Sequence, residues 1–126
     1  MARTYRQVAL HMDVIGSNPD SVEFYLKESL KYYGFTDSPG GIASTLSDYA
    51  KFCNDQGRYA EAIDYANKAL VIALPRKFAI LLSLIYIDLS KAHRELGNFK
   101  QSIEAADEGL VYSKQFESFD TQRDLY

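Results

Sequence analysis

The chain has 126 residues, of which 47% are hydrophobic and 25% are charged, and its formal net charge is −3. This composition is typical of a soluble globular domain with its own core and excludes a disordered segment. The acidic balance disfavours nucleic acid as a partner, because phosphate binding requires a basic surface. The single cysteine, Cys53, cannot form an internal disulfide, so no oxidising compartment is implied.

Helical spacing of apolar residues predicts six helices. In chain order they cover about residues 4–15, 19–33, 42–56, 59–73, 77–96 and 99–114. The fifth includes the most apolar stretch, 78–89, which is shorter than the roughly 20 residues needed to span a bilayer. No apolar segment of a secretory signal follows Met1. We therefore expect the fifth helix to be buried from two sides rather than inserted in a membrane.

Turn-forming residues separate the predicted helices. Gly57 and Gly97 each stand between two helices, where glycine adopts the left-handed backbone conformation at no steric cost, and we expect a positive φ at both. Pro75 is expected to separate the fourth helix from the fifth. The breakers of the N-terminal half are Ser17-Asn18-Pro19 and Asp37-Ser38-Pro39-Gly40-Gly41.

The chain matches itself at an interval of forty residues. Positions forty apart carry residues of the same kind or of similar size. Three such columns are Leu30, Leu70 and Leu110; Leu26, Ala66 and Ala106; and Ser29, Ala69 and Gly109. The small residues Ala62 and Ala66 are expected to let two helix axes approach closely. The period predicts an all-α fold of three stacked antiparallel helix pairs.

The second pair carries a motif that resembles the tetratricopeptide repeat (TPR). The motif reads Gly57-x-Tyr59-x-x-Ala62-Ile63-x-x-x-Ala66-x-x-Ala69-Leu70. The third pair matches this motif, with some small residues replaced by other small residues. It reads Gly97-x-Phe99-x-x-Ser102-Ile103-x-x-x-Ala106-x-x-Gly109-Leu110. Ala50 and Ser90 stand where the family often has glycine, and Cys53 and His93 where it often has tyrosine. The resemblance implies a right-handed superhelix of antiparallel helix pairs that binds a protein or peptide.

The repeats divide the chain into units. We expect a single TPR-like domain over 1–126, with units at about 3–41, 42–76 and 77–119 and the start of a fourth unit at 120–126. Asp120 would cap the first helix of that fourth unit, and the chain would then be a fragment of a longer protein. The alternative is that 120–126 form a short capping helix. Uncapped ends would also allow copies of the chain to associate.

No pattern of catalytic or ligand-binding residues is present. The sequence has no glycine-rich phosphate loop, no HExxH motif and no paired cysteines. Cys53 is interpreted as a small core residue and His93 as a partly buried structural one. We therefore expect neither an enzyme, nor a cofactor, nor a metal site.

The resemblance implies that the first helices of successive units line a concave groove. One row across this groove is His11, Lys51 and Lys91, a ladder of side chains that could bind a carboxylate or a backbone carbonyl. The other groove residues are Ser47, Asp48, Asn54, Ile87, Asp88 and Arg94. In the alternative interpretation each lysine pairs with the aspartate three residues before it on an exposed helix and needs no ligand.

Two functions remain open. The forty-residue period, longer than the usual period of about 34 residues, resembles the TPRs of bacterial regulators and sensors. It favours the sensory or regulatory segment of a larger signalling or transcription-regulating protein. The alternative is a segment of an adaptor or assembly scaffold with no effector domain. A cytoplasmic location is expected, with a periplasmic sensor segment as the alternative.

Overall fold

The computed structural model describes residues 19–124 and, within them, the side chains of residues 19–35 and 37–115. The backbone of this range forms five α-helices and no strand, which confirms the predicted all-α fold. They are α2 (Pro19–Thr36), α3 (Pro39–Asp55), α4 (Tyr59–Arg76), α5 (Ala79–Glu95) and α6 (Phe99–Asp124). The predicted helix at about 4–15 and the break at Ser17-Asn18 lie outside the described residues.

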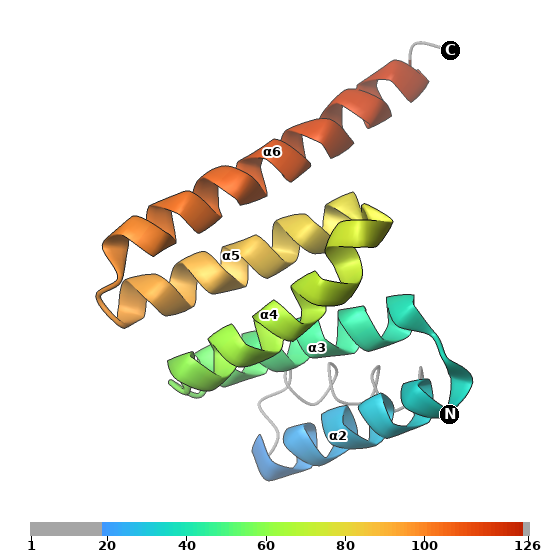
Figure 1. The fold of residues 1–126 in the computed structure, drawn as a ribbon, viewed down its shortest axis with the longest axis vertical. Coiled ribbons are helices and arrows are strands. Elements are labelled where there is room, and N and C mark those ends of the chain that lie inside the picture. Colours follow the sequence, from blue (N-terminus) through green and yellow to red (C-terminus); the bar gives the residue numbers. More distant parts are fainter. Residues whose placement is uncertain (1–18, 125–126) are drawn as a thin grey trace.

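The helices are stacked in chain order, with α2 at one end of the stack and α6 at the other (Figure 1). Each helix contacts the next one along the chain, and α3 also contacts α5. Thus α5 lies against both helices of the preceding pair and is covered by α6 on its other side. The prediction that this helix is buried from two sides is confirmed. No described helix is long and apolar enough to cross a membrane.

Glycine ends two of the helices, as predicted. Gly57 has φ 76° after α3, and Gly97 has φ 83° after α5. Each turn is closed by the amide of the following residue, which donates to a carbonyl of the last helical turn. The N–H of Arg58 donates to Cys53 O, and that of Asn98 donates to His93 O, both at 2.8 Å.

Proline plays a different part from the one predicted. The break between α2 and α3 is limited to Asp37 and Ser38, and Pro39 is already the first residue of α3. Ser38 caps this helix, its Oγ accepting from the N–H of Gly41 at 3.4 Å, and proline suits the first turn because its missing N–H would be unpaired there anyway. Pro75 lies inside the last turn of α4, which ends one residue later at Arg76 and is followed by Lys77 in the left-handed conformation, with φ 55°. Proline lacks the N–H that a helix interior needs and its ring clashes with the preceding turn, and α4 indeed ends one residue after Pro75.

The last helix is longer than predicted. The sequence indicates an end near Lys114 and a new helix from Asp120, whereas α6 continues from Phe99 to Asp124. No glycine or proline follows Gly109 in this segment, so nothing in the chain stops the helix.

The core lies where alanines of α4 meet the leucine and isoleucine side chains of α5. Ala62, Ala66 and Ala69 are at most 1% exposed, which agrees with the close helix approach predicted for the first two. The stripe of α5 that packs in one cluster with Ala66 and Ala69 consists of Leu82, Ile85 and Leu89, whereas Ala62 packs with Val22 and Leu26 of α2. A second stripe of α5, formed by Ile80, Leu84 and Ile87, stays more than half exposed.

Candidate functional site

Charged side chains predicted for the groove meet where α3 and α5 are in contact. The Nζ atoms of Lys51 and Lys91 lie 3.6 and 3.7 Å from the two carboxylate oxygens of Asp55. Lys51 and Asp55 are one turn apart on α3, whereas Lys91 comes from α5. Asp55 therefore links the two helices. The lysine side chains are 58% and 44% exposed, so a ligand can reach both.

Asp88 adds a titratable group to this arrangement. Its burial raises the pKa of the carboxyl to about 7. The positive charges of Lys51 and Lys91 act in the opposite direction, and the negative charges of Asp55 and Asp48 raise the pKa further. The charge of this site therefore changes near neutral pH. We refer to Asp48, Lys51, Asp55, Asp88 and Lys91 as the α3/α5 charged surface.

Two predicted groove residues are instead buried. Ser47 and Asn54 are 5% and 3% exposed, so neither is accessible to a ligand. The Nδ2 of Asn54 donates to the backbone oxygen of Asp88 at 3.0 Å and so joins α3 to α5. The Oδ1 of Asn54 is buried and has no hydrogen-bond partner among the described residues.

The remaining predicted residues lie elsewhere. Ile87 and Arg94 are exposed, and together with Lys91 they line a pocket of about 460 Å³ between α5 and α6. Lys91 thus stands between this pocket and the α3/α5 charged surface. His11 lies outside the described residues. Of the nine predicted residues, four belong to the charged surface: Asp48, Lys51, Asp88 and Lys91.

Cys53 and His93 have the surroundings expected of structural residues. Cys53 is fully buried, and this burial raises the pKa of its thiol to about 11, so the thiolate needed for nucleophilic chemistry is scarce at neutral pH. His93 is half-buried, and its Nδ1 lies 3.4 Å from the Nδ2 of Asn98 at the turn after α5. In the described part of the chain no group of histidine, cysteine and carboxylate side chains is arranged to hold a metal ion.

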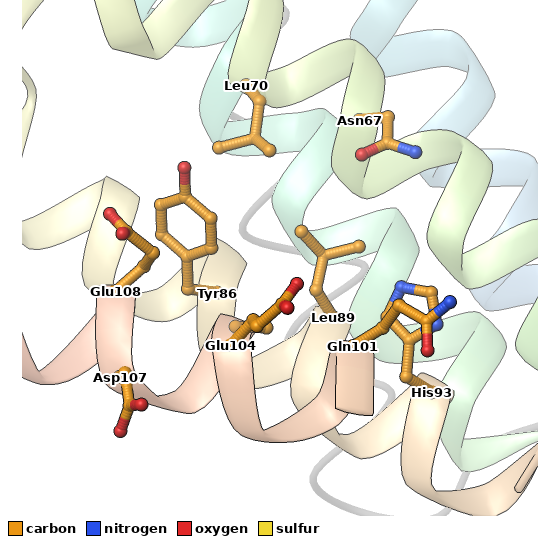
Figure 2. Close-up of a pocket in the computed structure, with 10 residues that line it drawn as sticks. Asn67, Leu70, Tyr86, Leu89, His93, Gln101, Glu104, Asp107 and Glu108 are labelled. Atoms are coloured by element: carbon orange, nitrogen blue, oxygen red, sulfur yellow. The ribbon is translucent and has the colours of Figure 1, made fainter. Parts of the chain in front are cut away.

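A second concavity, of about 540 Å³, was not predicted. It lies between α4, α5 and α6 and is lined by both polar and apolar side chains (Figure 2). Leu70 and Tyr86 point toward one another across it, and the carboxylates of Glu104 and Glu108 stand on the α6 side. These two glutamates are four residues apart and so share one face of a helix, a signal that was available in the sequence. The prediction considered only the first helix of each unit and therefore missed this pocket.

A partly buried polar network joins α2 to α3 and to Arg58, the residue before α4. The hydroxyl of Tyr49 donates to the Oε2 of Glu23 at 2.5 Å, and the guanidinium of Arg58 donates to the same oxygen at 2.9 Å. Tyr49 is only 1% exposed. The network contacts no pocket described above, and its role is to hold α2 against α3.

Comparison with known proteins identifies the repeated part of the chain. A family model described as "Tetratricopeptide repeat" matches residues 41–110, which cover α3, α4, α5 and the first half of α6. No curated protein and no solved structure matches the chain.

Proposed function

Because the chain belongs to the tetratricopeptide-repeat family, we propose that it binds a protein or peptide partner through the α3/α5 charged surface. Repeats of this family are generally protein-interaction modules and are typically non-catalytic. The proposal therefore takes the chain to be a binding module and not an enzyme. The partner would be an extended segment that lies across α3 and α5.

The observation that supports this surface is the position of Asp55 between Lys51 and Lys91. Both ammonium groups are within 3.7 Å of one carboxylate, and both remain largely exposed. A carboxylate or a backbone carbonyl of a partner can approach the same two cations from solvent. Charge-assisted hydrogen bonds of this kind contribute about 1.5–3 kcal/mol each when shielded from water, and much less when exposed.

For the test, peptides that bind the wild-type chain are first selected from a displayed random library. The selected peptides are titrated calorimetrically against wild type and the Lys51→Ala/Lys91→Ala double variant. Loss of both cations should weaken binding by about tenfold or more, the equivalent of one shielded charge-assisted bond. Because both side chains are exposed, the free energy of unfolding should change by less than about 0.5 kcal/mol.

A matched control removes two exposed lysines from second helices, Lys31→Ala in α2 and Lys100→Ala in α6. This variant has the same net charge as the double variant but keeps the α3/α5 charged surface. Equal affinity of the selected peptides for wild type and for both variants would eliminate the two lysines from the binding mechanism. A large loss of stability in the Lys51/Lys91 variant would show that these side chains are structural.

We further propose that this binding belongs to the sensory or regulatory part of a larger signalling or transcription-regulating protein. The forty-residue period supports it, since it resembles the long-period repeats of such proteins. An adaptor or scaffold is the alternative. The full reading frame decides between them: a kinase or helix-turn-helix region in the same frame supports the regulator, whereas an uninterrupted array of repeats supports the scaffold.

A further inference from the structure

The concavity of about 540 Å³ lies where the second helices of two successive units diverge. The backbones of α4 and α6 do not come close to one another, although each lies close to α5. Leu70 of α4 and Tyr86 of α5 form apolar walls, and the carboxylates of Glu104 and Glu108 stand on the α6 side (Figure 2). We refer to this space as the α4/α6 groove. It combines apolar walls with an acidic edge.

The preceding unit shows which side chains fill the equivalent space. Forty residues before Leu89 and Ala105, which line the α4/α6 groove, the chain has Tyr49 on α3 and Tyr65 on α4. The two tyrosine rings are stacked, with their centroids 4.0 Å apart and their planes 14° from parallel. Tyr65 packs against the cluster that includes buried residues of α2. In the preceding unit the chain itself therefore supplies an aromatic ring between α2, α3 and α4.

A cation accompanies the stacked rings of the preceding unit. The Nζ of Lys68 lies 5.1 Å from the centroid of the Tyr65 ring, a distance at which an ammonium group is attracted to an aromatic face. The counterpart of Lys68 is Glu108, and the counterpart of Asp64, one turn earlier, is Glu104. Where one unit supplies a ring and a cation, the next unit supplies a small side chain and two carboxylates.

Tyr86 does not take the place of the missing ring. It stands at the position of Leu46 and lines the groove, but its own ring stacks on that of Tyr112 in α6, with the centroids 5.9 Å apart and the planes 3° from parallel. Leu89 and Ala105 are both smaller than the tyrosines to which they correspond. The volume that a tyrosine takes in the preceding unit therefore belongs to the α4/α6 groove.

The carboxylates at the edge of the groove are accessible. Glu104 and Glu108 are exposed, and no ion pair among the described side chains involves either of them. Among the lining residues, His93 is the one that can become positively charged, and it lies next to Gln101 at one end of the groove (Figure 2). A positively charged ligand therefore meets complementary charge at this edge.

We propose that the α4/α6 groove binds a segment of a partner protein that inserts an aromatic side chain next to a lysine or arginine. The ring lies over Ala105 between Leu70 and Tyr86, and the cation lies at the carboxylates of Glu104 and Glu108. A buried aromatic anchor and a charge-assisted hydrogen bond are the contacts that contribute most to such recognition. The groove shares no residue with the α3/α5 charged surface, so the two sites are independent.

The test is a titration of the isotope-labelled chain with the peptide acetyl-Gly-Lys-Tyr-Lys-Gly-amide, followed by two-dimensional NMR. The peptide should shift the amides of Leu70, Leu89 and Ala105 and bind with a Kd of about 1 mM or below, as expected for a contact of one ring and one cation. Replacing its tyrosine by alanine, or both lysines by glutamate, should weaken binding about tenfold or more.

Two variants of the chain test the groove itself. Ala105→Tyr restores the ring of the preceding unit from within and should weaken peptide binding about tenfold or more, because the place of the ligand is taken. The matched control is Ile103→Tyr, the introduction of the same side chain at a residue of α6 that is 63% exposed and outside the lining; it should change the affinity less than about twofold. Glu104→Lys/Glu108→Lys, at two exposed positions, should make the glutamate peptide bind better than the lysine peptide.

Lys51→Ala/Lys91→Ala should leave the affinity for the lysine peptide unchanged, which separates this site from the proposed function. Three results would overturn the proposal. The first is the absence of saturable shifts at the groove up to about 10 mM peptide. The second is equal binding of the lysine and glutamate peptides to wild type. The third is a dimer in sedimentation velocity that Ala105→Tyr dissociates, which would make a second copy of the chain the occupant.

Discussion

Replacing Ala66 by leucine puts an isobutyl group in the space of a methyl group, at a point where α3, α4 and α5 meet. Ala66 is 0% exposed and belongs to the cluster that also holds Ala50 of α3 and Leu82 of α5. Overpacking a filled core costs about 1–3 kcal/mol. The site is closed on all sides by three helices, so the side chain cannot turn toward solvent. We therefore expect a loss in the upper half of this range, about 2–3 kcal/mol.

The measurement is urea unfolding followed by far-ultraviolet circular dichroism. Ala60→Leu is the matched control, since Ala60 is an exposed residue of the same helix and its replacement should change the free energy of unfolding by less than about 0.5 kcal/mol. If Ala66→Leu is no more destabilising than Ala60→Leu, the alanine face of α4 does not lie at the helix contact. The forty-residue register would then be wrong.

Two further predictions concern the turn after α3 and the charged surface. Gly57→Ala should lower the free energy of unfolding by about 1–2 kcal/mol in urea melts. Its φ is 76° and an added Cβ meets nothing within 4 Å, so backbone strain is the only cost. Gly40→Ala, which is equally open but has an ordinary φ, should cost nothing, and equal effects of the two variants would contradict the reasoning. The pKa of Asp88 rises from 3.8 to about 7 on folding. The folded chain therefore binds the carboxyl proton more tightly than the unfolded chain does. The stabilisation that results is present below pH 4 and is lost as the pH rises through about 7. Asp88→Asn should therefore be more stable than wild type at pH 8, by at least about 1 kcal/mol, with less or no advantage at pH 4. A constant difference across this range would refute the role of burial.

The periodic part of the fold could be predicted from the sequence because its signals are local. Gly57 and Gly97 mark turns through a property of glycine alone, and the alanine columns mark contacts that recur in each unit. Proline was misjudged because its effect depends on its neighbours. Pro39 begins a helix since Ser38 can cap it, and Pro75 lies within the last turn of α4 rather than beyond its end.

The site was harder to predict because it depends on contacts between helices that are not consecutive. The helical spacing of α3 correctly places Lys51 on an exposed face. It cannot show that Asn54 is buried against α5, because that contact skips α4. Asp55 was missed for the same reason: its importance comes from Lys91, which lies 36 residues away in the sequence. Whether the charged surface binds a partner stays a prediction.

The pattern of helix contacts also governs how a disturbance spreads through the molecule. In the described range the backbone of α2 comes close to that of α3 alone and the backbone of α6 comes close to that of α5 alone, while α3 and α5 each lie close to several helices. Stability is therefore transmitted from neighbour to neighbour, as in a one-dimensional array. The outer helices can open without disrupting the centre, and their amides should exchange with solvent sooner than those of α3 and α5. A ligand that bridges α3 and α5 would consequently stiffen the part of the molecule that opens last.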